Sequence, residues 1–187
     1  METTSSREIY ANPWMTIRED TFVRPDGGEG LYGVVDKPHY ALVIALDGDA
    51  QRSGAGPSER DRMMLVEQFR YPLGLRRWEF PQGTAPDRAV MDPAELAARE
   101  LREETGLTAR SWHPLGLLDV APGLSSQRGR AFLATDLVAG DPDREETEAD
   151  MRAAWVTRAE FEDRVRAGEI TDAQSIAAYA LLLLSGR

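Results

Sequence analysis

One short predicted helix presents three carboxylates on a single face in the sequence Arg99-Glu100-Leu101-Arg102-Glu103-Glu104-Thr105-Gly106-Leu107. At 3.6 residues per turn, Glu100, Glu103 and Glu104 stand at positions i, i+3 and i+4 and project from the same side. Exposed like charges at these spacings repel by roughly 0.2–0.5 kcal/mol per pair. A hard divalent cation offsets this repulsion, and Mg²⁺ commonly lies between carboxylates and a substrate's phosphates. The alternative is a solvated acidic face without a chemical role.

The flanking residues predict where this helix begins and ends. Asp92 is a good N-cap, Pro93 suits the first helical position, and a glutamate follows three residues after the cap in a capping-box-like pattern. Gly106 stands where a left-handed residue is favoured at the end of a helix. Arg99 lies one turn before Glu103 and can pair with it, which would orient that carboxylate and leave the other two for a cation.

The composition is that of an ordinary globular protein. The 187 residues are 42% hydrophobic and 29% charged, and this length suits one domain, or one domain with an additional arm. The net charge of −10 argues against binding to nucleic acid or to an anionic membrane. The chain has no cysteine, which excludes disulfides and thiolate metal sites. Because Met1–Arg7 is polar and no apolar run reaches about 18 residues, we expect a cytoplasmic protein.

The remaining sequence predicts an α+β fold in which helices sandwich a mixed sheet. Alternating or apolar segments favour strands, and segments that follow a helix cap favour helices. The predicted strands are Thr16–Arg24, Leu31–Asp36, 40–46, 63–71, 115–120, 129–134 and 151–156, and the predicted later helices are 158–167 and 172–185. The first two strands form a hairpin. Thr157 with Glu160 and Thr171 with Gln174 are the predicted caps of the later helices.

The nine residues of the acidic helix resemble the Nudix box. That family's pattern is Gly, five residues, Glu, seven residues, then Arg-Glu-apolar-x-Glu-Glu-x-Gly-apolar, and the second half matches from Arg99 to Leu107. The first half departs from the pattern, because Gly83 lies two residues too far from the helix and Met91 stands where the family has a glutamate. The segment 84–90 therefore contains a short insertion. Since the missing glutamate is mostly a supporting residue in the family, we expect loop geometry to differ more than chemistry.

Further motifs narrow the resemblance to the ADP-ribose pyrophosphatase-like Nudix enzymes, and together they cover about Ile9 to Leu184. Tyr10–Trp14 with the following hairpin resembles the subgroup's N-terminal arm, and Leu65–Tyr71 resembles its V-x-Q-[FY]-R strand. Trp78–Gly83 corresponds to its E-x-P-x-G segment before the box. Pro122–Gln127 is similar to a PGxSxE segment, and 168–173 to a G-x-I-x-D-A run. Gln127 replaces the acid of its motif.

The resemblance implies a Nudix-type α/β/α sandwich with an N-terminal β-hairpin arm. Residues 1–37 would form the arm and residues 38–187 the hydrolase domain. In similar enzymes the arm crosses to a second subunit, so a homodimer is expected. The arm contains four aromatic residues, Tyr10, Trp14, Phe22 and Tyr32, too many to leave in water on a hairpin that is marginal alone. The alternative is that the arm folds back on its own subunit.

The implied chemistry is hydrolysis of the pyrophosphate bond in a nucleoside diphosphate derivative. The implied cofactor is Mg²⁺, with Mn²⁺ as a possible substitute. Glu100 and Glu104 are the expected metal ligands, together with the main-chain carbonyl of Gln82. Glu103 would either bind a second ion or be organised by Arg99, and ions held in this way lower the pKa of a bound water and clamp the phosphates.

Four residues are expected to contact the substrate. Arg70 would hold a phosphate oxygen, although it could also be a surface arginine at the end of a strand. Tyr32 and Trp14 are candidate platforms for the nucleoside base, whereas Trp78 suits the core. Glu79 would accept hydrogen bonds from the substrate.

The general base is expected on the loop Gly140–Asp150, where similar enzymes often have a glutamate. Glu145, Glu146, Glu148 and Asp150 are the candidates, and counting back from the strand at 151–156 favours Glu148. A run of charge of this kind is also typical of a solvated loop.

Three functions are compatible with the sequence. The first is hydrolysis of ADP-ribose to AMP and ribose 5-phosphate. The second is hydrolysis of another nucleotide sugar, a dinucleoside polyphosphate or a damaged nucleotide. The third is a non-catalytic nucleotide-binding module, which the complete set of box glutamates disfavours.

Overall fold

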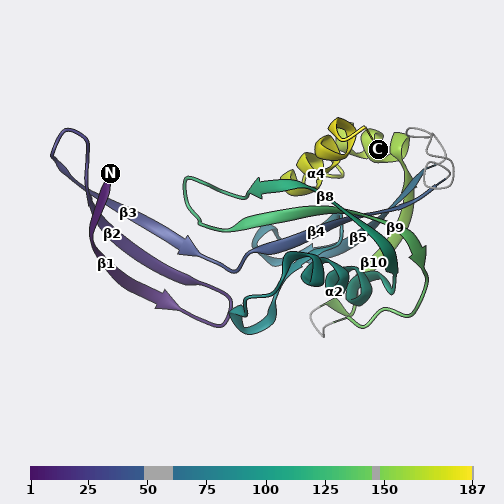
Figure 1. Ribbon diagram of the computed structural model, residues 1–187, viewed down its shortest axis with the longest axis horizontal. Coiled ribbons are helices and arrows are strands. Elements are labelled where there is room, and N and C mark those ends of the chain that lie inside the picture. Colours follow the sequence, from purple (N-terminus) through teal and green to yellow (C-terminus); the bar gives the residue numbers. More distant parts are fainter. Residues whose placement is uncertain (49–60, 145–147, 187) are drawn as a thin grey trace.

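The computed structural model describes residues 1–48, 61–144 and 148–186. Its first three strands, β1 (Glu2–Ala11), β2 (Thr16–Val23) and β3 (Glu29–Asp36), form an antiparallel sheet of their own. This sheet is an arm that projects away from the rest of the chain (Figure 1). The predicted hairpin is confirmed as β2 and β3, with Thr16 opposite Asp36 and Val23 opposite Glu29.

The other seven strands form a mixed sheet. They are β4 (Tyr40–Asp47), β5 (Arg62–Arg70), β6 (Leu75–Glu79), β7 (Gln82–Thr84), β8 (Thr108–Asp119), β9 (Arg128–Val138) and β10 (Arg152–Thr157). The order is β10-β5-β4-β9-β8, with β6 paired to β5 and β7 to β4. Only the pairing of β4 with β9 is parallel among the described strands. Central β4 is buried on both faces, which explains its uninterrupted apolar sequence.

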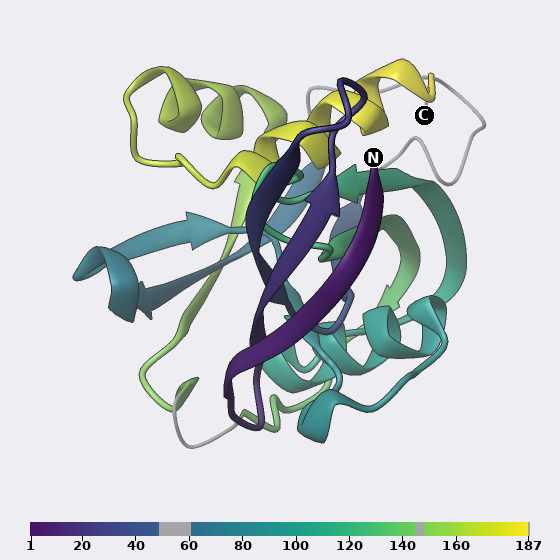
Figure 2. The same cartoon turned by 90° about the vertical axis from the view of Figure 1, so that its left-hand side faces the viewer.

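Helices cover both faces of this sheet (Figure 2). Helix α2 (Pro93–Thr105) lies on one face, where Leu96 and Leu101 pack against Val43. Helices α3 (Arg158–Arg166) and α4 (Ala173–Leu184) lie on the other. The predicted α+β sandwich is therefore confirmed. Short 3₁₀ turns, η1 (Tyr71–Leu73) and η2 (Pro86–Arg88), complete the elements. No helix in the described part of the chain is long and apolar enough to cross a membrane.

The helix boundaries follow the predicted caps with one exception. Asp92 accepts hydrogen bonds from the Ala94 and Glu95 amides at 2.9 and 3.2 Å, and Gly106 ends α2 with φ 76°. Helix α3 has the predicted capping box. The predicted cap of α4 is wrong by one residue, because the Asp172 carboxylate, not Thr171, accepts from an amide of the first turn.

Three strands were not predicted. Strand β1 is exposed along its whole length and is rich in threonine and serine, so it lacks the apolar alternation that indicates a strand. Its partner is β2, an interaction between distant segments that local sequence does not show. Strands β6 and β7 are only five and three residues long and flank Pro81, which has no amide hydrogen for a sheet, so their local signal is weak. Strands β8 and β9 are also longer than predicted.

Candidate active site

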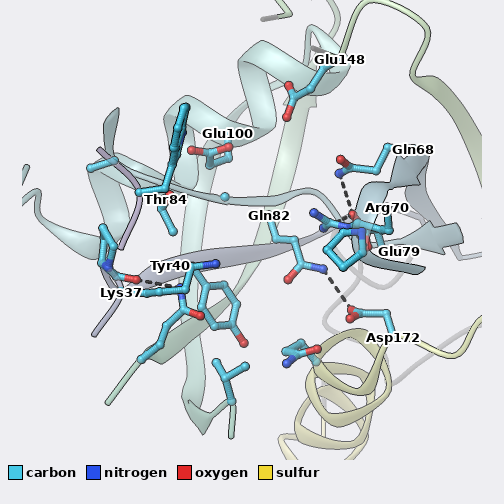
Figure 3. A pocket seen from close by; sticks show the side chains of 18 of the residues that line it. Lys37, Tyr40, Gln68, Arg70, Glu79, Gln82, Thr84, Glu100, Glu148 and Asp172 are labelled. Carbon is cyan, nitrogen blue, oxygen red and sulfur yellow. Dashed lines mark hydrogen bonds and ion pairs between the residues drawn. The ribbon is translucent and has the colours of Figure 1, made fainter. Parts of the chain in front are cut away.

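A cleft of about 890 Å³ lies between α2, the strands β5 to β7, the start of α4 and the turn between β1 and β2 (Figure 3). Most of the predicted site residues line it, namely Trp14, Arg70, Glu79, Gln82, Glu100, Glu103 and Glu148. Three predicted residues, Tyr32, Arg99 and Glu104, do not line the cleft of their own chain. Segments that are far apart in the sequence thus bring the predicted residues together.

Glu104 is the most unusual carboxylate of this region. It is 1% exposed, and neither of its carboxylate oxygens has a hydrogen-bond partner among the described residues. Burial raises the pKa of Glu104 well above its usual value, and repulsion from Glu100, Glu148 and Glu79 raises it further. The Arg70 guanidinium offsets only part of this effect. The fold therefore gathers several carboxylates with too little positive charge to balance them.

Glu100 approaches the backbone of β7 at Gly83. A Cβ atom at Gly83 would lie only 2.3 Å from Oε2 of Glu100, so any larger residue would displace this carboxylate. The glycine of the predicted E-x-P-x-G segment is thus required by a close approach. This close approach brings the Glu100 carboxylate of α2 beside Gln82, which precedes Gly83 on β7.

The predicted contact between Arg99 and Glu103 is present. The Arg99 Nε group lies 2.8 and 2.9 Å from the two carboxylate oxygens of Glu103, and Arg102 adds a contact at 3.3 Å. This pairing distinguishes Glu103 from Glu104, although both belong to the acidic face of α2. Glu103 is already balanced by cations, whereas no described cation forms an ion pair with Glu104.

Glu79 is held by two neighbours on β5. It is 1% exposed, and it accepts hydrogen bonds from Gln68 Nε2 at 2.7 Å and from Arg70 Nε at 3.1 Å, with a further contact from the second Arg70 nitrogen. Burial raises the pKa of Glu79 to about 7 although Arg70 acts to lower it. Arg70 is therefore not a loose surface arginine: a buried carboxylate fixes its orientation at the cleft.

Asp172 is a cleft residue that the sequence reasoning missed. Its Oδ2 accepts hydrogen bonds from Gln82 Nε2 at 3.0 Å and from the Ser175 amide at 2.8 Å. It therefore caps α4 and also orients the Gln82 side chain (Figure 3). The G-x-I-x-D-A motif included this aspartate, and its capping position was the available signal.

Two arm aromatics have different places in the single chain. Trp14 is 70% exposed and lines the cleft, on a turn in which Asn12 Oδ1 accepts from the amides of Trp14 and Met15 at 2.9 and 2.8 Å. The Tyr32 hydroxyl instead donates to the Gly123 carbonyl at 2.8 Å, away from this cleft. The base-stacking role of Tyr32 stays a prediction that requires the cleft of another subunit.

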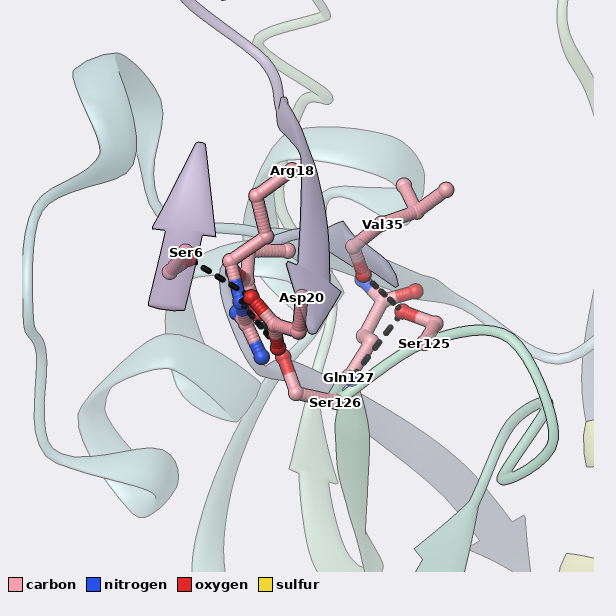
Figure 4. A network of polar contacts seen from close by, with 8 residues as sticks. Ser6, Arg18, Asp20, Val35, Ser125, Ser126 and Gln127 are labelled. Atoms are coloured by element: carbon pink, nitrogen blue, oxygen red, sulfur yellow. Dashed lines mark hydrogen bonds and ion pairs between the residues drawn. The ribbon is translucent and has the colours of Figure 1, made fainter. Parts of the chain in front are cut away.

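The PGxSxE-like segment anchors the arm (Figure 4). Ser125 Oγ donates to the Val35 carbonyl at 2.7 Å, and the Ser126 hydroxyl donates to Asp36 at 2.5 Å. Gln127, which replaces an acid, is buried and donates from Nε2 to the Pro38 carbonyl at 2.8 Å. This segment therefore fixes the junction between the arm and the larger sheet.

The candidate bases differ in their positions. Glu148 lines the cleft and contributes to the repulsion that acts on Glu104. Asp150 does not line the cleft and pairs with Arg76 at 2.5 Å. Glu145 and Glu146 lie outside the described residues. Of the two described candidates, Glu148 has the position that suits the predicted role.

The donor set suits a hard cation even though no three His, Asp or Glu side chains in the described segments form a ready-made metal site. The supporting observation is the buried Glu104 carboxylate, whose two oxygens lack hydrogen-bond partners. Nearby ligands would also be oxygens, from Glu100 and from the main chain of Gln82, and Mg²⁺ prefers oxygen ligands.

Comparison with known proteins identifies the class of this site. Residues 54–179 match the family model of the NUDIX domain, and residues 1–35 match that of the nucleoside diphosphate sugar hydrolase N-terminal domain. The chain therefore belongs to the Nudix family, as its acidic helix predicted.

Several relatives align over nearly the whole chain. An ADP-ribose pyrophosphatase of Mycobacterium tuberculosis is 37% identical over 177 residues, which cover 94% of this chain and 80% of the relative. A CMP-5'-(N-acetyl-N-hydroxy-3-aminopropyl)phosphonate hydrolase of Streptomyces rubellomurinus is 29% identical and is covered to 81%, with 96% of this chain aligned. The solved structure of an ADP compounds hydrolase has the same fold, with a TM-score of 0.79 at 16% identity over 97% of this chain and 92% of that one.

Proposed function

We propose that this Nudix protein hydrolyses ADP-ribose to AMP and ribose 5-phosphate with Mg²⁺ as its cofactor. The observation that carries the proposal is the buried Glu104 carboxylate, which has no hydrogen-bond partner in the described segments and stands among Glu100, Glu148 and Glu79 beside a cleft of suitable size. The names of the relatives from Mycobacterium tuberculosis and Bacillus subtilis support the substrate, the second being 26% identical over 98% of this chain.

Glu100, Glu104 and the main-chain carbonyl of Gln82 would hold the Mg²⁺, or Mn²⁺ in its place. When bound, the ion neutralises phosphate charge and lowers the pKa of a bound water. Glu103, held by Arg99, would support the site or contribute to a second ion.

The chain's own residues have distinct proposed roles. Arg70 binds a phosphate oxygen, and Glu79 acts through Arg70 by fixing its orientation rather than by direct contact with the substrate. Trp14 offers its exposed ring to the adenine base. Glu148 removes a proton from the attacking water as the phosphate–oxygen bond breaks. Positioning and charge balance are the main requirements of phosphoryl transfer, and this set supplies both.

We also infer a cytoplasmic homodimer in which residues 1–37 form the dimerisation arm and residues 38–187 the hydrolase domain. Ile9, Tyr10 and Leu31 are 51%, 50% and 63% exposed, although such side chains favour burial. The arm projects from its own hydrolase domain (Figure 1), and Tyr32 lies away from the cleft of its own chain. A second subunit would cover these residues and bring Tyr32 to a nucleotide.

The experiment that tests the substrate is product analysis. The protein is incubated with Mg²⁺ and ADP-ribose, ADP-glucose, a diadenosine polyphosphate or CMP linked to a phosphonate, and the products are separated by chromatography. We expect AMP and ribose 5-phosphate in equal amounts, with ADP-ribose cleaved fastest. Faster cleavage of another compound would move the proposal to that substrate, and cleavage of none would favour a binding module.

A further inference from the structure

A second pocket of about 400 Å³ lies beside the cleft, between the start of α2 and the ends of β8 and β9. Its apolar lining includes Met91, Leu96 and Leu117. Four cationic side chains also line the pocket, namely Lys37, Arg88, Arg128 and Arg130, together with His39. No carboxylate from the described residues lines the pocket. This concentration of positive charge stands out in a chain whose net charge is −10.

Three of these cations have no counter-charge among the described residues. Lys37, Arg88 and Arg130 form no ion pair with any residue that the structure describes. Arg128 is different, because it pairs with Asp119 at 3.2 Å. Several like charges around one concave, partly apolar surface repel each other, and an anionic ligand would relieve that repulsion.

The insertion in the first half of the Nudix box forms one wall of this pocket. Asp87 and Arg88 have left-handed backbone conformations, with φ of 52° and 58°, which residues other than glycine rarely adopt. Asp87 lines the cleft, whereas Arg88, Val90 and Met91 line the second pocket. The inserted loop therefore contributes residues to both sites. Met91, which replaces the family's glutamate, contributes an apolar surface where a carboxylate would have opposed an anion.

We propose that this basic pocket binds a phosphate monoester attached to an aromatic or apolar body. A phosphate monoester has a charge of about −1.5 to −2. This charge matches several unpaired cations better than the single negative charge of a carboxylate does. Arginine binds phosphate oxygens through paired N–H groups, and the apolar lining would cover the attached group. The volume is within the range of small-molecule sites.

The ligand could reach the pocket in two ways. Lys37, Pro38, Tyr40 and Ala85 line both the cleft and the basic pocket, so the two are adjacent. Lys37 and Tyr40 lie across the cleft from Arg70 (Figure 3). The phosphate could thus belong to a separate molecule or to the far end of a long substrate that extends from the cleft.

The test uses the methyl group of Met91 as a local probe, because Met91 lines the basic pocket and not the cleft. Full-length protein with ¹³C-labelled methionine methyl groups is titrated in EDTA with AMP, with adenosine and with an ADP-ribose derivative that carries a phosphate monoester at its far end, and Met91→Leu identifies the signal. We expect a saturable shift with AMP and none with adenosine. Arg130→Glu should weaken this binding about tenfold or more, because it reverses one unpaired charge.

Arg110→Glu is the matched control, since Arg110 is another exposed arginine of the same strand pair, on β8, without an ion pair to a described residue. It should leave the AMP titration unchanged. A shift with AMP identifies a separate ligand, whereas a shift with the longer compound alone, weakened by Arg130→Glu, identifies a substrate end. The proposal would be overturned if no phosphate compound shifted the Met91 signal. It would also be overturned if Arg130→Glu and Arg110→Glu bound the phosphate compound with equal affinity. The readout needs no turnover, so it is independent of the proposed hydrolysis.

Discussion

Replacement of Glu104 by glutamine should stabilise the metal-free protein while abolishing its activity. The ordinary pKa of this carboxyl is 4.5, and burial together with three neighbouring carboxylates raises it well above that value in the folded state. The unfolded chain therefore loses the proton first as the pH rises, and folding becomes less favourable by about 1.4 kcal/mol per pH unit until the folded carboxyl also ionises. At about pH 7.5 this penalty reaches at most about 4 kcal/mol.

Glutamine removes the titration but leaves a buried amide without partners, which costs about 1–3 kcal/mol. The net gain is therefore at most about 3 kcal/mol at about pH 7.5, and it should vanish or reverse near pH 5, where little of the titration penalty remains. Urea denaturation in EDTA, followed by circular dichroism at both pH values, measures it. Mg²⁺ should then stabilise the wild type and have little effect on Glu104→Gln.

Glu103→Gln is the control for this experiment, because Arg99 already balances that carboxylate at 2.8 Å. It should lose stability slightly at either pH. The reasoning is refuted if Glu104→Gln is less stable than the wild type in EDTA at about pH 7.5, since the carboxylate would then have partners that compensate its burial.

Three further results are expected. In steady-state kinetics, Glu148→Gln should lower kcat strongly with little change in KM or Mg²⁺ affinity, whereas Asp150→Asn should behave nearly as the wild type. Equal activity of the two variants would assign the general base to another residue. Deletion of residues 1–37 should give a monomer or aggregate by light scattering, and this variant should be inactive. Tyr32→Ala should raise the KM for ADP-ribose more than it lowers kcat. A wild-type protein that is monomeric and fully active would contradict both expectations. Because burial raises the pKa of Glu79 from 4.5 to about 7, the metal-free protein should lose stability as the pH rises between these values, and urea midpoints of Glu79→Gln should show a smaller loss.

The sequence predicted elements whose signals are local. Asp92, Pro93 and Gly106 fixed the ends of α2 because caps depend on a few adjacent residues. Strand β1 was missed because it is paired with β2, a separate segment, and buries no apolar face. The left-handed conformation of Arg88 has no residue-type signal, since such positions usually have glycine.

The candidate site was predicted as a set of residues but not as an arrangement. The spacing of the acidic helix placed Glu103 and Glu104 on one face, yet it could not show that one pairs with Arg99 while the other is buried without partners. Asp172 was missed because its contact with Gln82 joins segments about ninety positions apart. Such contacts depend on the tertiary fold, which local patterns do not specify.

The most direct test of the central claim is cleavage of ADP-ribose by the wild type, Glu100→Gln and Glu104→Gln, with Mg²⁺ and with EDTA. AMP release is quantified by chromatography, and the folded state of each variant is checked by circular dichroism. We predict that only the wild type with Mg²⁺ (or Mn²⁺) releases AMP at a substantial rate, and that both folded variants are slower by several orders of magnitude. Release of AMP in EDTA, or by both variants within a few-fold of the wild type, would contradict the assignment of these carboxylates as metal ligands.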